Sequence, residues 1–522
     1  MRIDYLIPEQ LDANAVEAAL CEKIRFSTEP VRHETCTYYD SFDGRLYGNN
    51  TILEERVEGK QRKAVFRRLN DASPLAEARI TRKPAFIQDL PPGRLHDELA
   101  PLLEMRELLP LASVRSRVRC LRMLNREEKT VARVLIEESD MQIRKGAKAR
   151  RLAGRVSLLP VRGYNKPVAH IKKRLESLQL ATDSQDPLLS ALAISGITPG
   201  GYSSKLGLQL DPDMRGDMAV RIILHRLLDI MLANEAGTRT GTDSEFLHDF
   251  RVAVRRTRSA LGQIKGVLPL RILNRYKREF AWLGQITGNT RDLDVYLLKF
   301  DDYKNSLPAS TQNDIEPLRD FLHRHWRDEH RTLVRALDTA RYRRLVTGWR
   351  SFLEQPVNER STLPNARRPV YEIARERIWR VYKRILKEGR AIETDTPAEA
   401  LHELRKTAKK LRYLMEFFQS LFPSGKIKRL ISVLKDLQNN LGDFQDFEVQ
   451  VLTLRRFSQQ MVAENMAPAG TLLAMGMLID GLERRQQLAR QEFSDRFEAF
   501  SQPENQARFR ALFASPVQAG TT

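Results

Sequence analysis

From Met218 onward, apolar side chains recur at the spacing of helices that bury one face. One such stripe consists of Ile222, Ile223, Leu227, Leu228 and Met231. The same pattern, with Glu and Arg on the outer faces, returns in the segments 315–338, 371–388 and 470–498. Gly and Pro are concentrated between these segments, so the pattern predicts an all-α region.

The first 140 residues have a different pattern, in which β-branched and alternating residues favour strands. The clearest example is a hairpin over 114–138 with its turn near Asn125. Residues 141–215 combine a basic stretch, one predicted helix near 168–180 and turn-rich Pro, Gly and Asp clusters. We therefore expect an α+β chain with a strand-rich domain at 1–145, a connector at 146–214, a helical domain at 215–515 and a flexible tail at 516–522.

The helical region contains an internal repeat. Leu-His-Asp-Phe-Arg at 247–251 returns as Leu-His-Glu-Leu-Arg at 401–405, an offset of 154 positions (401 minus 247). The match continues without a gap for roughly fifty residues, as far as Val295 and Val449. It predicts two copies of one helical unit, at about 215–370 and 371–515, related by a pseudo-twofold axis.

Basic residues recur in both copies at positions 0, 3, 7 and 10 counted from the histidine, which lie within an arc of roughly 80° on a helix. The two stripes are His248, Arg251, Arg255 and Arg258, and His402, Arg405, Lys409 and Arg412. Arg256 and Lys410 flank them. The opposite faces are apolar, with Phe250, Val254 and Leu261 in the first copy and Leu404, Leu411 and Met415 in the second.

Like charges at this spacing repel by about 0.2–0.5 kcal/mol per pair, so their recurrence suggests a compensating anion. The net charge of +20 and the isoelectric point near 9.9 also favour an acidic partner. The stripes therefore predict a site for a polyanion. The alternative interpretation is a basic face that is only solvated.

His248 and His402 lie among arginines whose charge opposes a divalent cation, and neither has a second His or a Cys at ligand spacing. We therefore expect no metal site and no cofactor. A bound anion would instead favour the imidazolium form and make each histidine a donor. Asp292 and Asp446 follow glycines of the repeat, and we expect them to support the structure, either by starting helices or by pairing with the basic residues.

The N terminus lacks the basic and apolar regions of a secretory signal, and no stretch is apolar enough to span a membrane. Cys21, Cys36 and Cys120 have no metal-binding spacing and are interpreted as reduced thiols. A cytoplasmic protein is expected, without a membrane partner. The sequence alone assigns no oligomeric state.

The repeat resembles the CHAD family, the conserved histidine α-helical domain. In the first copy the resemblance rests on the motif Leu247-His248-x-x-Arg251-Val252-Ala253-x-Arg255-Arg256-x-Arg258 and on the segments at 283–284 and 291–295. In the second copy it rests on the segment 401–413 and on 437–446. It covers about 215–515 and implies two helical bundles, a basic surface around a central pore, and non-catalytic binding of inorganic polyphosphate at polyphosphate granules.

The N-terminal domain resembles the CYTH, or triphosphate-tunnel, family more weakly, through the segment 38–46 and the strand from Arg115 to Arg119. The alternating glutamates of that family are replaced by Arg2-Ile3-Asp4-Tyr5, and Glu54-Glu55 stand where basic residues are expected. We therefore interpret the domain as degenerate and inactive, because triphosphate hydrolysis there needs metal-binding glutamates. The alternative is a CYTH-type triphosphate or polyphosphate hydrolase that captures substrate with its helical domain.

Nucleic-acid binding is a further alternative, because a basic chain attracts any polyanion. The stripes lack interleaved aromatic residues for base stacking, and no recognised DNA- or RNA-binding motif is present. Inorganic polyphosphate is therefore the expected partner, and nucleic acid the less favoured one.

Overall fold

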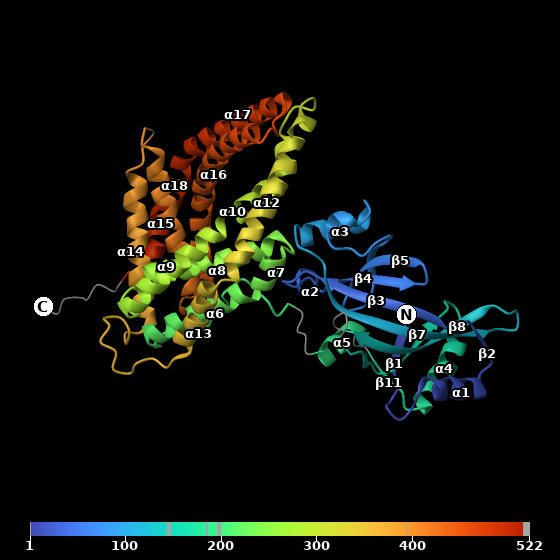
Figure 1. Ribbon diagram of the computed structural model, residues 1–522. Coiled ribbons are helices and arrows are strands. Elements are labelled where there is room, and N and C mark those ends of the chain that lie inside the picture. The colour runs from blue at the N-terminus through green and yellow to red at the C-terminus, as the bar shows by residue number, and fades with distance from the viewer. Residues whose placement is uncertain (1, 143–147, 184–185, 196–199, 394, 515–522) are drawn as a thin grey trace. The chain divides into compact units, whose positions relative to one another are not determined.

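The computed structural model describes residues 2–142, 148–183, 186–195, 200–393 and 395–514. It divides into two compact units, 1–203 and 204–522. The first unit is strand-rich and the second is helical, which confirms the α+β class (Figure 1). The expected tail at 516–522 and the expected domain border at 145 lie outside the described residues.

The first unit is built on one antiparallel sheet with the strand order β11-β1-β10-β8-β7-β3-β4-β5-β6, with β2 added to β7 and β9 to β8. Its strands are β1 (Ile3–Leu6), β2 (Phe26–Thr28), β3 (Arg32–Asp40), β4 (Thr51–Glu58), β5 (Gln61–Arg68), β6 (Pro74–Arg79), β7 (Leu109–Leu124), β8 (Thr130–Gln142), β9 (Arg150–Arg151), β10 (Arg155–Pro160) and β11 (Ala181–Thr182). The predicted hairpin is confirmed as β7 and β8.

The helices of this unit are α1 (Ala13–Lys23), α2 (Arg45–Gly48), α3 (Arg94–Leu103), α4 (Asn165–Ser177) and α5 (Pro187–Ser195), with a 3₁₀ turn at Ile87–Asp89. Helices α1 and α4 pack on the sheet through Val16, Leu20, Ile171 and Leu175. The chain at 150–182 is therefore not a connector: β10 lies between β1 and β8, and α4 covers its apolar residues. A six-residue strand is too short to be recognised beside the strong turn signals that flank it.

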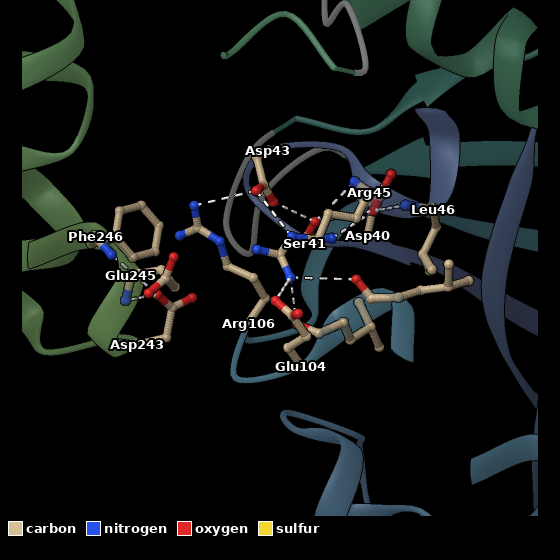
Figure 2. Close-up of polar contacts among 12 residues, drawn as sticks. Asp40, Ser41, Asp43, Arg45, Leu46, Glu104, Arg106, Asp243, Glu245 and Phe246 are labelled. Atoms are coloured by element: carbon tan, nitrogen blue, oxygen red, sulfur yellow. Dashed lines mark hydrogen bonds and ion pairs between the residues drawn. The ribbon is translucent and has the colours of Figure 1, made fainter. Parts of the chain in front are cut away.

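A tight turn follows β3, and Figure 2 shows its polar contacts. The buried carboxylate of Asp40 accepts hydrogen bonds from the backbone N–H groups of Ser41, Leu46 and Tyr47, at 2.7, 2.8 and 2.9 Å. Asp43 accepts from Arg45 at 3.1 Å and from Arg106 at 3.3 Å. The motif at 38–46 thus satisfies its own backbone donors, which explains its Asp and Ser residues structurally.

The second unit contains α6 (Gly216–Ala233), α7 (Glu235–Thr240), α8 (Ser244–Gln263), α9 (Leu270–Ile286), α10 (Gly288–Leu298), α11 (Phe300–Asn305), α12 (Glu316–Leu337), α13 (Ala340–Glu354), α14 (Val370–Arg390), α15 (Ala398–Phe417), α16 (Ser424–Ala463), α17 (Ala469–Gln491), α18 (Phe493–Ser501) and α19 (Pro503–Phe513). Short 3₁₀ turns lie at Gln312–Ile315 and Gln419–Leu421. No described helix is both long and apolar enough to cross a membrane.

The repeat is visible in the helix boundaries. Helices α6, α8 and α9 begin at 216, 244 and 270, and α14, α15 and α16 begin 154 positions later, at 370, 398 and 424. The copies share a core in which Leu293 and Phe321 of the first meet Leu454 and Leu478 of the second. Because neither copy buries these residues alone, the two form one folding unit.

The two copies differ in the continuity of one helix. The first copy has α9 and α10 with a junction at Thr287, whereas α16 runs unbroken for 40 residues. Asp292 is therefore the fifth residue of α10, and Asp446 lies in the middle of α16. The expectation that these aspartates start helices is wrong, because α10 already begins at Gly288 and α16 has no break at Gly442.

Close packing between helices predicts unequal effects for two glycines. A methyl group at Gly389 of α14 would overlap the ring of the buried Phe497, whereas one at Gly442 of α16 would meet no heavy atom within 4 Å. We expect Gly389→Ala to lower the free energy of unfolding by about 1–3 kcal/mol. We expect Gly442→Ala to raise it by up to about 1 kcal/mol, because Ala is the better helix former. Urea unfolding followed by circular dichroism measures both, and equal changes would contradict this packing.

Candidate functional site: a basic groove between the two copies

Helices α8 and α15 are fixed by their apolar faces. Phe250 and Leu261 of α8, and Leu404 and Leu411 of α15, are at most 1% exposed. Asp243 starts α8 by accepting hydrogen bonds from the N–H groups of Glu245 and Phe246, at 2.9 and 3.2 Å. Because these faces are buried, the basic residues of both helices must lie on the opposite side.

The basic faces line a central groove with a volume of about 880 Å³. The predicted residues that line it are His248, Arg251 and Arg255 of α8, and Arg405 and Lys409 of α15. A second cavity of about 480 Å³ adjoins it, because Arg255 and Lys409 line both. Arg258 and Lys410 line the second cavity. The structure thus brings seven of the ten predicted binding residues onto one continuous surface.

The cations of the groove raise one another's energy. Burial and repulsion from Arg405 and Arg255 lower the pKa of Lys409 to about 8. Burial, with repulsion from Arg255 and Arg291, lowers the pKa of Arg251 to about 10. Arg251 is held in place by donating from Nη1 to the carbonyl of Gly284 at 3.0 Å and to Oγ1 of Thr287 at 2.9 Å. The groove is therefore preorganised and electrostatically strained, and an anion would relieve that strain.

His248 is oriented by an arginine. Nη2 of Arg291 donates to Nδ1 of His248 at 3.0 Å, while Nη1 of Arg291 donates to the carbonyl of Ser244 at 3.0 Å. A guanidinium nitrogen offers no lone pair, so Nδ1 is the acceptor and the ring proton is on Nε2. Without a bound anion, His248 can therefore serve as a neutral donor while it keeps the contact with Arg291. The imidazolium form expected with a bound anion stays a prediction.

Three predicted residues are not among those that line the groove or the second cavity. Nε2 of His402 lies 2.8 Å from a carboxylate oxygen of Glu448, and its ring lies beside Phe444. Arg256 donates to Glu416 at 3.0 Å, and Nε of Arg412 lies 3.4 Å from the same carboxylate. The two helices do not present equivalent faces, since α15 turns Lys406 and Lys410 toward the second cavity. The sequence repeat could not reveal this difference in rotation.

The structure adds cations that the sequence analysis missed. Arg291, Lys299 and Arg456 line the groove, and Lys277 and Lys406 line the second cavity. None of the three in the groove recurs in the other copy, where Gln445, Thr453 and Asp302 occupy the equivalent positions. A search for repeated basic residues therefore cannot find them, and only the packing of α10 and α16 places them here.

The two aspartates of the repeat also line the groove. Asp446 accepts a hydrogen bond from Nη2 of Arg405 at 3.0 Å, which agrees with the expected role of pairing with a basic residue. Asp292 lies in the same groove and raises the pKa of Arg251, although burial and cation repulsion outweigh it. The groove therefore keeps a few internal anions among a larger number of cations.

In the first unit, the acidic residues that the sequence analysis considered in relation to a triphosphate-tunnel site, Asp4, Glu54 and Glu55, form ion pairs. Arg2 donates to Asp4 at 2.7 Å, while Arg67 pairs with the buried Glu54 and Arg62 with the buried Glu55. Within the described residues, no three His, Cys, Asp or Glu side chains gather in a way that could hold a metal ion.

Comparisons with known proteins agree with the helical repeat. A family model described as the CHAD domain matches residues 222–455. Two uncharacterized proteins from two strains of Mycobacterium tuberculosis are each 27% identical over 308 residues, or 55% of this chain. The chain covers 56% of the length of these relatives.

Two solved structures are similar at low identity. The CHAD domain from the plant Ricinus communis is 22% identical with a TM-score of 0.43, covering 60% of this chain and 97% of that one. A putative adenylyl cyclase from Hippeastrum, described as having a dominant triphosphatase activity, is 11% identical with a TM-score of 0.27, covering 39% of this chain and 100% of that one. The matched range contains both α8 and α15, so the chain carries a CHAD domain at residues 222–455.

Proposed function

We propose that this protein binds inorganic polyphosphate in the central groove, without transforming it, and associates with polyphosphate granules. The observation that carries the proposal is the convergence of Arg251, Arg255, Arg405 and Lys409, from both copies of the repeat, on one groove. Their mutual repulsion and partial burial lower the pKa of Lys409 and Arg251. An occupant with closely spaced negative charges would stabilise all four.

A linear polyanion suits this surface better than a single small anion. The groove and the second cavity are joined through Arg255 and Lys409, so cations follow one another along α8 and α15. Arginine presents several donors in a planar fork, which matches the oxygens of successive phosphate groups. The resemblance to the CHAD family supports polyphosphate as that polyanion.

A binding role is favoured over hydrolysis by the state of the first unit. Asp4, Glu54 and Glu55 are already paired with Arg2, Arg67 and Arg62, and the paired Glu54 and Glu55 are at most 2% exposed. Triphosphate hydrolysis of the tunnel type needs carboxylates that can bind divalent ions. Phosphate release from tripolyphosphate by the full chain with Mg²⁺ or Mn²⁺ would instead support the hydrolase alternative.

Charge reversal tests the groove directly. Changing Arg251, Arg255, Arg405 and Lys409 to Glu should abolish binding of long-chain polyphosphate, because each substitution replaces an attraction with a repulsion. A control with the same change in net charge is the reversal of the exposed Arg324, Arg343, Arg484 and Arg496. The control should retain most of the affinity in a filter-binding assay. Equal losses in the two variants would show that total charge, and not the groove, determines binding.

The pKa of Lys409 predicts a pH dependence. In the free protein it is lowered to about 8, so the side chain loses its proton as the pH rises from 7 to 9. Affinity for long-chain polyphosphate should therefore fall by about tenfold over this range, the size of one charge-assisted contact. Lys409→Arg keeps the charge and should flatten the profile. Identical profiles for the wild type and this variant would contradict the assignment.

Competition separates polyphosphate from nucleic acid. The aromatic side chains Tyr296 and Phe457 of the groove are at most 6% exposed, so they offer little surface for base stacking. A groove dominated by arginine and lysine should therefore prefer the flexible, more densely charged chain. At matched salt, polyphosphate should displace duplex or single-stranded DNA at a lower concentration of phosphate units than DNA displaces polyphosphate. A fluorescence-anisotropy assay measures this, and the reverse order would favour nucleic acid as the partner.

A further inference from the structure

A third cavity of about 250 Å³ lies at the C-terminal end of α8, against α14 and α15. Its cationic lining residues are Lys265, Arg377, Arg380, Arg384 and Lys410, and none of its described lining residues is acidic. We name it the corner cavity. It shares Gly262, Gln263 and Lys410 with the second cavity, so it continues the basic surface that begins in the central groove.

The repeat provides an internal comparison for this corner. Arg380 and Lys410 correspond to Arg226 and Arg256, each 154 positions earlier. In the first copy both arginines donate hydrogen bonds to backbone carbonyls of the protein. Arg226 donates to the carbonyls of Leu206 and Lys205 at 3.2 and 3.3 Å, and Arg256 donates to the carbonyl of Ser204 at 2.9 Å.

A carboxylate completes the occupied corner. Glu416 accepts a hydrogen bond from Nη2 of Arg256 at 3.0 Å, and its equivalent beside the corner cavity is Gly262 (416 minus 154). The second corner also lacks the backbone carbonyls that accept from Arg226 and Arg256 in the first. The equivalent residues, 358–359, accept hydrogen bonds from Arg215 instead. The corner cavity therefore has the cations of its counterpart without the acceptors that the counterpart possesses.

The remaining partners of these cations leave the corner positively charged. Arg380 donates to Glu376 at 2.8 Å and Arg384 to Glu388 at 2.5 Å, but neither glutamate is a lining residue of the cavity. Arg377 donates from Nε to the carbonyl of Gln263 at 2.7 Å, and burial with repulsion from Arg380 lowers its pKa. The position of its guanidinium is thus fixed by the backbone and not by a carboxylate.

Gly262 has no structural reason to be glycine. It lies in the last turn of α8 with no positive φ, and a Cβ atom there would meet no heavy atom within 4 Å outside the neighbouring helix backbone. Glycine inside a helix costs about 0.5–1 kcal/mol relative to alanine. Its position at the junction of the second cavity and the corner cavity gives a reason: the passage between them stays open, and no side chain at this position competes for Lys410.

We propose that the corner cavity is a phosphate subsite that holds a distal part of a polyphosphate chain running from the central groove past Gly262. The inference rests on the proposed function and adds a direction and a length requirement to it. From Arg251 to Gly262 the track follows α8 for about 16 Å at 1.5 Å per residue. Tripolyphosphate is much shorter than the track from the central groove to the corner, so only longer chains occupy both ends. The first-copy corner, closed by 204–206 and Glu416, offers no equivalent subsite.

The test places at Gly262 a carboxylate equivalent to that of Glu416, which closes the corner around Arg226 and Arg256. Gly262→Glu should pair with Lys410 and weaken the binding of long-chain polyphosphate by about tenfold, the loss of one charge-assisted contact. Gly262→Gln has nearly the same shape without the charge and should change affinity less than threefold. Both substitutions improve helix propensity, so folding should be retained. Tripolyphosphate, bound in the central groove, should have the same affinity for both variants as for the wild type.

A second variant removes two cations of the subsite that lie on α14. Arg380→Gln with Arg384→Gln should reproduce the loss for long chains and spare tripolyphosphate. Equal affinities of Gly262→Glu and Gly262→Gln for long chains, with no loss in the α14 double variant, would overturn the subsite while leaving the proposed function intact. Failure of the wild type to bind long chains at all would instead overturn the proposed function. Isothermal titration calorimetry at fixed salt measures every case.

Discussion

The rest of the structure depends on the burial of two apolar helix faces, on α8 and α15. This burial outweighs the repulsion among the cations that the two helices carry. Helices α8 and α15 are fixed by apolar side chains that are almost fully buried, so their basic faces cannot turn away from each other. The cost appears as lowered pKa values at Arg251 and Lys409. The energy that burial contributes to folding thus holds these cations together in the groove.

The two copies of the repeat differ in which of their cations already have internal partners. The helix starts keep the same spacing, and a shared core joins the copies into one unit. The side chains that differ between copies decide which cations are available. Where Glu416 pairs with Arg256, the basic residue supports the fold, whereas Gly262 at the equivalent position leaves Lys410 without that carboxylate.

Other charged residues also differ in whether they already have a partner within the protein. His402 and Arg412 belong to the repeated motif but contact glutamates of their own copy. In the first unit, Glu54 and Arg67 are buried together with Asp186, a network in which each charge needs the others. Net charge alone therefore overstates the surface that a polyanion can reach, because many cations already have internal partners.

The sequence determined the class of the fold, the hairpin at 114–138, the repeat, and five of the basic residues that line the central groove. It could do so because helical spacing and a fixed offset are properties of the chain itself. It missed β10, the unbroken course of α16, and the cations Arg291, Lys299 and Arg456. Tertiary structure decided these features, because a short strand is stabilised by its neighbours and a charge on one helix gains its role from the helices packed against it. The rotation of α15 relative to α8, and with it the exclusion of His402 from the groove, depends on that packing alone.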